Sequence, residues 1–188
     1  FFRKTGVFTK AEDESVKSPQ IEAIDEAKES APKVDFVEIS SPLAGEVKEL
    51  SQATDPVFAQ GVMGQGVVIE PSEGILVAPV NGVVSVLFPT KHAVGIVSDE
   101  GVELLMHIGM DTVNLEGKGF ETYVAQGDKV TMGDKLISFD MTAIKEVGYV
   151  TETPVIITNQ DQFQADERGQ LPRKIECGDK LMTATRIG

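Results

Sequence analysis

Short apolar runs alternate with turn residues along most of this chain. From residue 34 onward these runs are four to seven residues long, and glycine, proline, asparagine or aspartate separates them. Ten runs are predicted to be strands: residues 34–39, 45–50, 66–70, 75–78, 82–88, 94–97, 102–108, 135–139, 155–158 and 180–184. A helical pattern is evident only at 141–147, after a candidate cap at Asp140, so at most one helix is expected. The pattern predicts an all-β protein, either a β-sandwich or a partly closed barrel.

Two short motifs occur twice. Ser-Pro-Leu-Ala-Gly-Glu-Val at 41–47 resembles Ala-Pro-Val-Asn-Gly-Val-Val at 78–84, and Gly-Asp-Lys-Leu occurs at both 133–136 and 178–181. In each case a turn of small residues leads into an apolar strand. We therefore expect a sandwich built from two related halves.

The first 33 residues have a different composition. Between residues 10 and 33, Glu, Asp, Lys, Ser, Ala and Pro predominate, which is typical of a mobile or weakly helical linker. We expect 1–33 to be a linker or N-terminal extension and 34–188 to be the folded domain. The start, Phe1-Phe2-Arg3-Lys4, fits the cytoplasmic end of a removed membrane helix, and an ordinary terminus explains it equally well.

Charge and cysteine content narrow the functional classes. The formal net charge of −13 repels phosphate backbones, so nucleic acid is not an expected partner, and proteins with positive patches are. The single cysteine, Cys177, permits no intramolecular disulfide and fits a reducing compartment. No apolar run reaches the ~20 residues that a membrane span requires. A soluble, cytoplasmic protein is expected.

The only two histidines, His92 and His107, fall within one predicted hairpin. If the turn is centred between Asp99 and Glu100, His92 lies directly opposite His107. Opposed side chains in an antiparallel pair have Cβ atoms about 4.5–5.5 Å apart, so both imidazoles could meet one shared group. In this register the histidine face also carries Val94, Ile96, Leu105 and Glu103. Apolar surroundings keep imidazole neutral and nucleophilic.

A histidine pair of this kind has three chemical uses. It could bind a metal with a third ligand, act as a general base with its orienting group, or carry a phosphoryl group. A zinc site lacks a clear third ligand, and no G-x-S-x-G motif supports a hydrolase. Phosphoryl transfer needs one ring to attack while the other donates a hydrogen bond, and it needs no cofactor. This use is favoured over two unrelated structural histidines.

Seven segments, taken in order, resemble a known family. They are Ser-Pro-Leu-Ala-Gly at 41–45, Asp-Pro-Val-Phe-Ala at 55–59, Ala-Pro-Val-Asn-Gly at 78–82, Thr-Lys-His-Ala at 90–93, Leu-Leu-Met-His-Ile-Gly-Met-Asp-Thr-Val at 104–113, Gly-Lys-Gly-Phe at 117–120 and Thr-Pro-Val-Ile at 153–156. From residue 34 to the end, the chain resembles the glucose-type enzyme IIA of the bacterial phosphoenolpyruvate-dependent sugar phosphotransferase system. The resemblance implies a β-sandwich of the duplicated hybrid-motif type. It also implies phosphorylation by the phosphocarrier HPr and transfer to a cysteine of an enzyme IIB domain.

The resemblance also implies roles for individual residues. His107 would be phosphorylated, His92 would support the phosphoryl group, and Thr90 would hydrogen-bond His92. An apolar ring with an acidic edge, facing basic partner residues, would consist of Val57, Phe58, Phe88, Asp55 and Asp111. Simpler interpretations are core packing for the phenylalanines, turn capping for the aspartates and a strand end for the threonine.

Three rival functions stay open beside the phosphocarrier. One is a regulatory module that binds its targets according to its phosphorylation state, and another is a zinc hydrolase on a related scaffold. The third is a lipoyl- or biotinyl-like carrier, which needs a hairpin-tip lysine with flanking residues that neither Gly-Asp-Lys-Leu copy has. The expected location is the cytoplasm, at the inner face of the cell membrane if the domain is part of a multidomain permease. The sequence does not indicate which sugar is transported.

Overall fold

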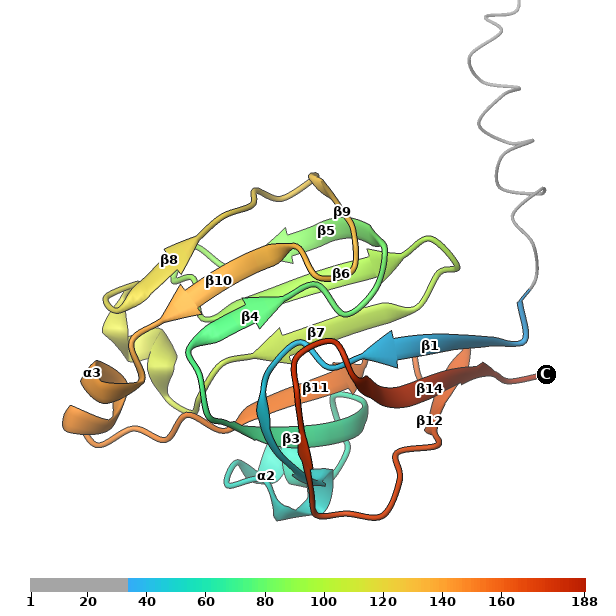
Figure 1. The fold of residues 1–188 in the computed structure, drawn as a ribbon, viewed down its shortest axis with the longest axis horizontal. Coiled ribbons are helices and arrows are strands. Elements are labelled where there is room, and N and C mark those ends of the chain that lie inside the picture. The colour runs from blue at the N-terminus through green and yellow to red at the C-terminus, as the bar shows by residue number, and fades with distance from the viewer. Residues whose placement is uncertain (1–33) are drawn as a thin grey trace, which may run out of the picture. The chain divides into compact units, whose positions relative to one another are not determined.

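The computed structural model describes residues 34–188 (Figure 1). The predictions of a linker in 1–33 and of a membrane-helix end at residues 1–4 lie outside the described residues. The strands are β1 Phe36–Ser40, β2 Gly45–Glu49, β3 Gln65–Pro71, β4 Ile75–Val77, β5 Gly82–Leu87, β6 Ala93–Ser98, β7 Glu103–His107, β8 Phe120–Thr122, β9 Lys129–Val130, β10 Lys135–Phe139, β11 Thr153–Ile157, β12 Phe163–Asp166, β13 Arg173–Ile175 and β14 Lys180–Arg186. The helical turns are η1 Leu50–Gln52, α2 Pro56–Ala59, η2 Thr112–Leu115 and α3 Met141–Glu146.

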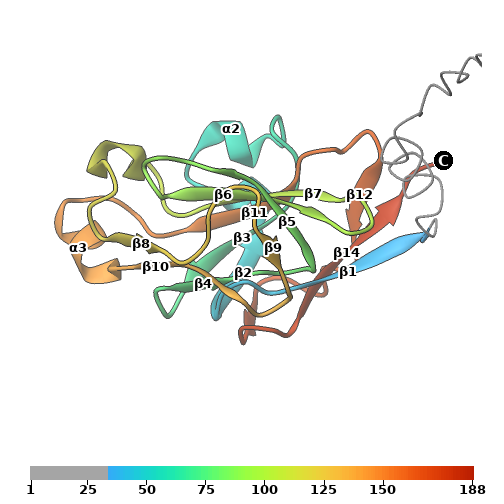
Figure 2. The same ribbon diagram turned by 90° about the horizontal axis from the view of Figure 1, so that it is seen from above.

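The strands form one large antiparallel sheet and two small ones. The large sheet has the order β13-β2-β3-β11-β7-β6-β5-β9, and the small sheets have the orders β1-β14-β12 and β4-β10-β8. One apolar cluster joins all three sheets, with fully buried residues such as Ile39, Ile69, Leu76, Ile96 and Ile137. Helix α2 lies on the side of the large sheet opposite to β1 and β4 (Figure 2). The all-β sandwich is confirmed, and the described strands do not close into a barrel.

All ten predicted strands are present, and four short strands were not predicted. β8, β9, β12 and β13 are two to four residues long, and each has a single buried residue, so no apolar alternation marks them. The helix expected at 141–147 is α3, whose cap Asp140 accepts a hydrogen bond from the Ala143 backbone N–H at 3.0 Å. The limit of one helix was wrong, because Asp55 and Pro56 begin a second short helix, α2.

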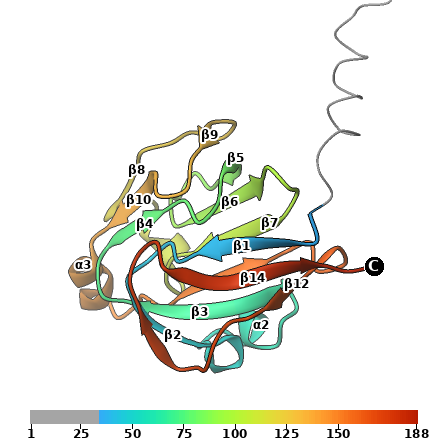
Figure 3. The same ribbon diagram turned by 45° about the vertical axis from the view of Figure 1, so that its right-hand side comes forward.

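The repeated motifs occupy equivalent positions in the two halves. In the first copy the Ser41 backbone N–H donates to the carbonyl of Asp179 at 2.7 Å. In the second copy the Ala78 backbone N–H donates to the carbonyl of Asp134 at 2.8 Å. The glycine before each aspartate donates back to the same serine or alanine. Each strand-entry motif therefore binds one Gly-Asp-Lys-Leu turn, which places β1 beside β14 and β4 beside β10 (Figure 3).

The predicted register of the histidine hairpin was wrong by one residue. His107 pairs with Ala93 rather than with His92. The turn contains three residues instead of two, since the Ser98 backbone N–H donates to the carbonyl of Val102 at 2.8 Å. The third residue is Gly101, with φ of 98°, a conformation that glycine adopts at little cost.

The corrected register also exchanges the faces of β6. Val94 and Ile96 pair with Met106 and Leu104, and all four side chains lie in the core between the sheets. The prediction that Val94 and Ile96 share the histidine face was therefore wrong. The outer face of β7 carries His107 together with Leu105, which is half-buried. Within residues 34–188, no helix has the length and apolar character that crossing a membrane requires.

Candidate functional site

The two histidine rings lie against each other although their residues are not paired. Their ring centroids are 4.8 Å apart, and the ring planes are nearly perpendicular at 83°. His107 is the last residue of β7, whereas His92 lies in the connection just before β6. The carbonyl of His92 accepts a hydrogen bond from the Ile108 backbone N–H at 2.7 Å, which ties the two segments together.

The tautomer of His107 is set by a backbone carbonyl. Its Nδ1 lies 2.8 Å from the carbonyl oxygen of Gly109. A carbonyl can only accept, so Nδ1 carries the hydrogen, and in the neutral ring Nε2 keeps its lone pair. Gly109 has φ of 75°, and a Cβ atom there would lie 2.7 Å from the carbonyl oxygen of Val150. Glycine is therefore required for the carbonyl to take this position.

His92 has a hydroxyl partner. Thr90 Oγ1 lies 2.8 Å from Nδ1 of His92. When Thr90 donates this hydrogen bond, Nε2 of His92 carries the ring hydrogen and can donate it to a group bound beside His107. The bond also orients a ring that is almost completely buried.

Two phenylalanines complete the ring cluster. Phe58, from α2, is buried, and its ring centroid lies 5.2 Å from that of His107. Phe88, which follows β5, is half-buried and meets His92 edge-on at 5.5 Å. Each imidazole therefore has its own aromatic neighbour, supplied by a different connection of the large sheet.

Both histidines are held in their neutral form. Burial, with a smaller effect of the nearby His107, lowers the pKa of His92 to about 4, and hydrogen bonding to Thr90 opposes part of this shift. Burial also lowers the pKa of His107, against the opposing effects of the Gly109 carbonyl and the Asp55 charge. Neutral imidazole keeps a lone pair for nucleophilic attack at neutral pH.

The remaining residues of the expected ring are Asp55, Val57 and Asp111. Asp55 caps α2 by accepting a hydrogen bond from the Val57 backbone N–H at 2.8 Å, so the turn-capping interpretation holds for it. Its charge also acts on His107. Val57 is 47% exposed. Asp111 is exposed, has φ of 63° and makes no side-chain capping bond, so turn capping does not explain it.

Sequence reasoning missed two contributors to the site. Gly109 lies within the segment 104–113 that carries the resemblance, but its role depends on a carbonyl, which no residue pattern reveals. Glu152 lies 45 residues from His107 in the sequence, and its carbonyl accepts a hydrogen bond from the Gly109 backbone N–H at 3.0 Å. No local signal could have found Glu152.

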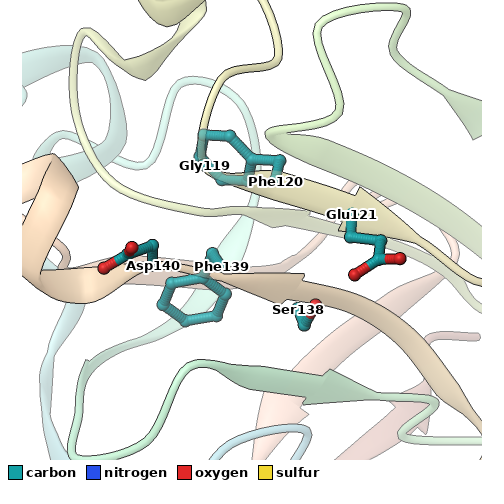
Figure 4. Close-up of a pocket in the computed structure, with 6 residues that line it drawn as sticks. All are labelled: Gly119, Phe120, Glu121, Ser138, Phe139 and Asp140. Atoms are coloured by element: carbon teal, nitrogen blue, oxygen red, sulfur yellow. The ribbon is translucent and has the colours of Figure 1, made fainter.

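A hollow beside α3 and the acidic side chains are two other places where a site could lie. Figure 4 shows a hollow beside the start of α3, lined by Gly119, Phe120, Glu121, Ser138, Phe139 and Asp140. It contains neither histidine and offers no nucleophile paired with a base. Among residues 34–188, no group of three or more His, Cys, Asp and Glu side chains is arranged to hold a metal ion. The zinc hydrolase alternative therefore lacks a ligand set in this part of the chain.

A β-sandwich that presents a neutral histidine with a lone pair on Nε2, beside the ring of a second histidine, has the arrangement that nucleophilic group transfer requires. The chain belongs to the phosphoenolpyruvate-dependent sugar phosphotransferase system EIIA 1 family, whose model matches residues 37–163. It is thus a phosphotransferase component of that system, and the resemblance found in the sequence is confirmed.

Three similar proteins agree with this assignment. The β-glucoside-specific EIIBCA component of Bacillus subtilis (strain 168) is 57% identical over 125 residues, which are 66% of this chain and 20% of that protein. The glucose-specific EIIA component of Bacillus cereus is 51% identical over 127 residues, 68% of this chain and 77% of that protein. The solved glucose permease IIA from Mycoplasma capricolum has a TM-score of 0.71 at 34% identity, covering 80% of this chain and 96% of that one. The chain spans about a fifth of the length of the β-glucoside-specific relatives.

Proposed function

We propose that the chain is a phosphocarrier that accepts a phosphoryl group from phospho-HPr on Nε2 of His107 and passes it to a cysteine of an enzyme IIB domain. The observation that carries this proposal is the hydrogen bond from Nδ1 of His107 to the Gly109 carbonyl, beside the ring of His92. That bond leaves Nε2 as the nucleophile. No cofactor is needed, because the intermediate is a covalent phosphohistidine.

The chemistry of acceptance follows from the two rings. The Nε2 lone pair of His107 attacks phosphorus, and the bond from phosphorus to the donor's histidine nitrogen breaks, with its electron pair returning to the donor. The His107 ring becomes positively charged, which strengthens the bond from Nδ1–H to the Gly109 carbonyl. Nε2–H of His92 then donates to a phosphoryl oxygen, as charge develops there.

Transfer onward reverses these steps with a different partner. A thiolate of the enzyme IIB domain attacks phosphorus, the bond from phosphorus to Nε2 breaks, and His107 returns to its neutral tautomer. The N–P bond is reactive because imidazole is a good leaving group when Nδ1 stays protonated. The role of this chain is to position and desolvate the group that moves.

The partner surface is proposed to surround the histidines. Val57 and Phe88 supply apolar contact, while Phe58, expected in the same ring, is buried and packs in the core beside His107. Asp55 and Asp111 face basic residues of HPr or enzyme IIB. The EIIBCA component of Bacillus subtilis joins EIIB, EIIC and EIIA in one protein, as its name says, and this supports an enzyme IIB partner. A cytoplasmic location, at the inner face of the membrane in a multidomain permease, follows from this proposal.

Intact-mass spectrometry at neutral pH tests the acceptor. The protein is incubated with phosphoenolpyruvate, enzyme I and HPr, and wild type is compared with His107→Ala and His92→Ala. We expect one acid-labile phosphoryl group on wild type and on His92→Ala, and none on His107→Ala. Wild-type protein that gains no phosphoryl group would refute the proposal, and a phosphorylated His107→Ala variant would place the acceptor elsewhere.

A further inference from the structure

Glu152 makes two kinds of contact just before β11. The residue is half-buried, and its carboxylate accepts a hydrogen bond from the Thr54 backbone N–H at 3.1 Å and another from the Thr54 hydroxyl. These bonds join segments that are 98 residues apart in the sequence. They hold the start of the α2 segment against the end of the connection that enters β11.

The main chain of Glu152 leads to His107 by a second route. The Glu152 carbonyl accepts a hydrogen bond from the Gly109 backbone N–H at 3.0 Å. The Gly109 carbonyl in turn accepts from Nδ1 of His107 at 2.8 Å. Only one residue therefore lies between Glu152 and the imidazole in this chain of hydrogen bonds.

The side-chain route leads to a second contact of the same ring. Thr54 directly precedes Asp55, which caps α2. Helix α2 carries Phe58, whose ring lies 5.2 Å from the His107 ring. Glu152 thus contacts both the segment that supplies the aromatic wall and the turn that supplies the carbonyl.

We infer that Glu152 is a positioning residue for His107: its carboxylate fixes α2 and its carbonyl fixes the Gly109 turn, so that the imidazole keeps its contacts with both Phe58 and the Gly109 carbonyl. Glu152 does not touch the reacting atoms. Its importance for phosphoryl transfer rests on the proposed function. Its effect on the ring of His107 can be measured without any transfer.

Three substitutions separate positioning from general stabilisation. Glu152→Ala removes both side-chain bonds. Glu152→Gln keeps them, because the amide oxygen accepts from the Thr54 backbone and the amide nitrogen donates to the Thr54 hydroxyl. Glu46→Ala is the matched control, since Glu46 is another half-buried glutamate that lies on β2 and pairs only with Lys48, at 4.0 Å.

The first readout is the His107 ring in the unphosphorylated protein, followed by nitrogen NMR through a pH titration. Burial is the main cause that lowers the pKa of His107, so release of α2 in Glu152→Ala is expected to raise this pKa towards its ordinary value. The charge of Asp55 raises the pKa of His107, so the withdrawal of Asp55 together with α2 would oppose that rise only in part. The ring of His92 faces His107 as well. In Glu152→Ala the neutral His107 ring should also populate both tautomers. In Glu152→Gln and Glu46→Ala the pKa and the tautomer of His107 should match those of wild type.

The second readout is the rate at which phospho-HPr phosphorylates each variant. Misplacement of a reacting group by about 1 Å can cost up to about a hundredfold in rate, so a loss of tenfold or more is expected for Glu152→Ala, with recovery in Glu152→Gln. If Glu152→Ala does not fold, Thr54→Val removes the hydroxyl bond alone and should shift the same ring signals in the same direction, by less.

The inference is overturned if a folded Glu152→Ala, or Thr54→Val in its place, keeps the wild-type tautomer and His107 pKa. A slower rate with an unchanged ring titration would also overturn it, because the effect would then not pass through His107. Wild-type protein that takes no phosphoryl group would refute the proposed function alone, since the ring titration would still test Glu152.

Discussion

The two halves of the sandwich differ most in the connection that follows the first strand of each repeat. In the first half, residues 50–64 join β2 to β3 and contain η1 and α2, whereas in the second half residues 88–92 join β5 to β6. The long connection covers β3 and β11, where Phe58 packs with Val68 and Ile156 in a separate small core. The short connection leaves a hollow over part of β5, β6 and β7.

Strand pairing shows which residues correspond between the halves. The repeated motif makes Gly45, at the start of β2, correspond to Gly82, at the start of β5. When the strand pairing is followed from these glycines, Val68 on β3 corresponds to Gly95 on β6, and Ile156 on β11 corresponds to His107 on β7. Ile156 is fully buried, while His107 is only half-buried. Beside Phe88 and Leu105, the second half leaves an open hollow of about 420 Å³. Both halves share the duplicated strands, and the length of one connection makes the difference. We call the first half, with the long connection, the closed half, and the second half, with the hollow, the open half.

The largest expected difference between the halves is in stability. Phe58→Ala should lower the free energy of unfolding by about 3–5 kcal/mol, because Phe58 is 4% exposed and its removal leaves a cavity in the small core. Phe88→Ala should cost less than about 2 kcal/mol, because Phe88 is half-buried beside the open hollow. Urea denaturation of both variants measures the two values. Equal losses would contradict the distinction between a closed and an open half.

Short apolar runs between turn residues were enough to predict ten strands and the sandwich, because each of those strands buries at least one face and some, such as β11, bury both. They could not fix the register of the histidine hairpin. Two-residue and three-residue turns both fit Asp-Glu-Gly, and the choice depends on the positive φ of Gly101. Helix α2 was missed since its four residues are too few for a helical period to be visible.

The site was predictable where single residue types carry the chemistry. The two histidines and Thr90 could be named from the sequence, and the structure brings them together. The Gly109 carbonyl could not be named, because every residue has a carbonyl and only the fold selects one. The Glu152–Thr54 contact joins distant segments, so neither segment shows it alone.

The open half should also make the protein sensitive to acid. Unfolded His92 binds a proton near pH 6.5 and folded His92 near pH 4, so the unfolded state holds more protons between these values. Stability is therefore fully present above pH 6.5 and falls as the pH drops towards 4, by at most about 3 kcal/mol from His92. The lowered pKa of His107 acts in the same direction.

Urea denaturation across this pH range measures the effect. His92→Gln should remove most of the slope, because glutamine does not titrate. An unchanged slope in His92→Gln would assign the acid sensitivity to groups other than His92. Ile156, the counterpart of His107 in the closed half, has no titrating side chain, so a substitution there should leave the slope unaltered.

The smallest expected effect separates the two acidic residues at the rim. Asp55→Ala removes the cap of α2 in the long connection and should cost about 1 kcal/mol of unfolding free energy. Asp111→Ala removes an exposed side chain with no capping bond and should change stability by less than about 0.5 kcal/mol.

Both variants lose a charge that we propose faces a basic partner, so both should react more slowly with phospho-HPr at low salt and approach the wild-type rate at high salt.

Thermal unfolding and stopped-flow mixing test these two statements separately. If Asp111→Ala loses as much stability as Asp55→Ala, then Asp111 has a structural role that its exposed side chain does not show. If neither variant changes the salt dependence of the rate, the acidic rim does not steer the partner. The apolar residues Val57 and Phe88 would then have to account for docking, and the open face beside His107 would act by shape rather than by charge.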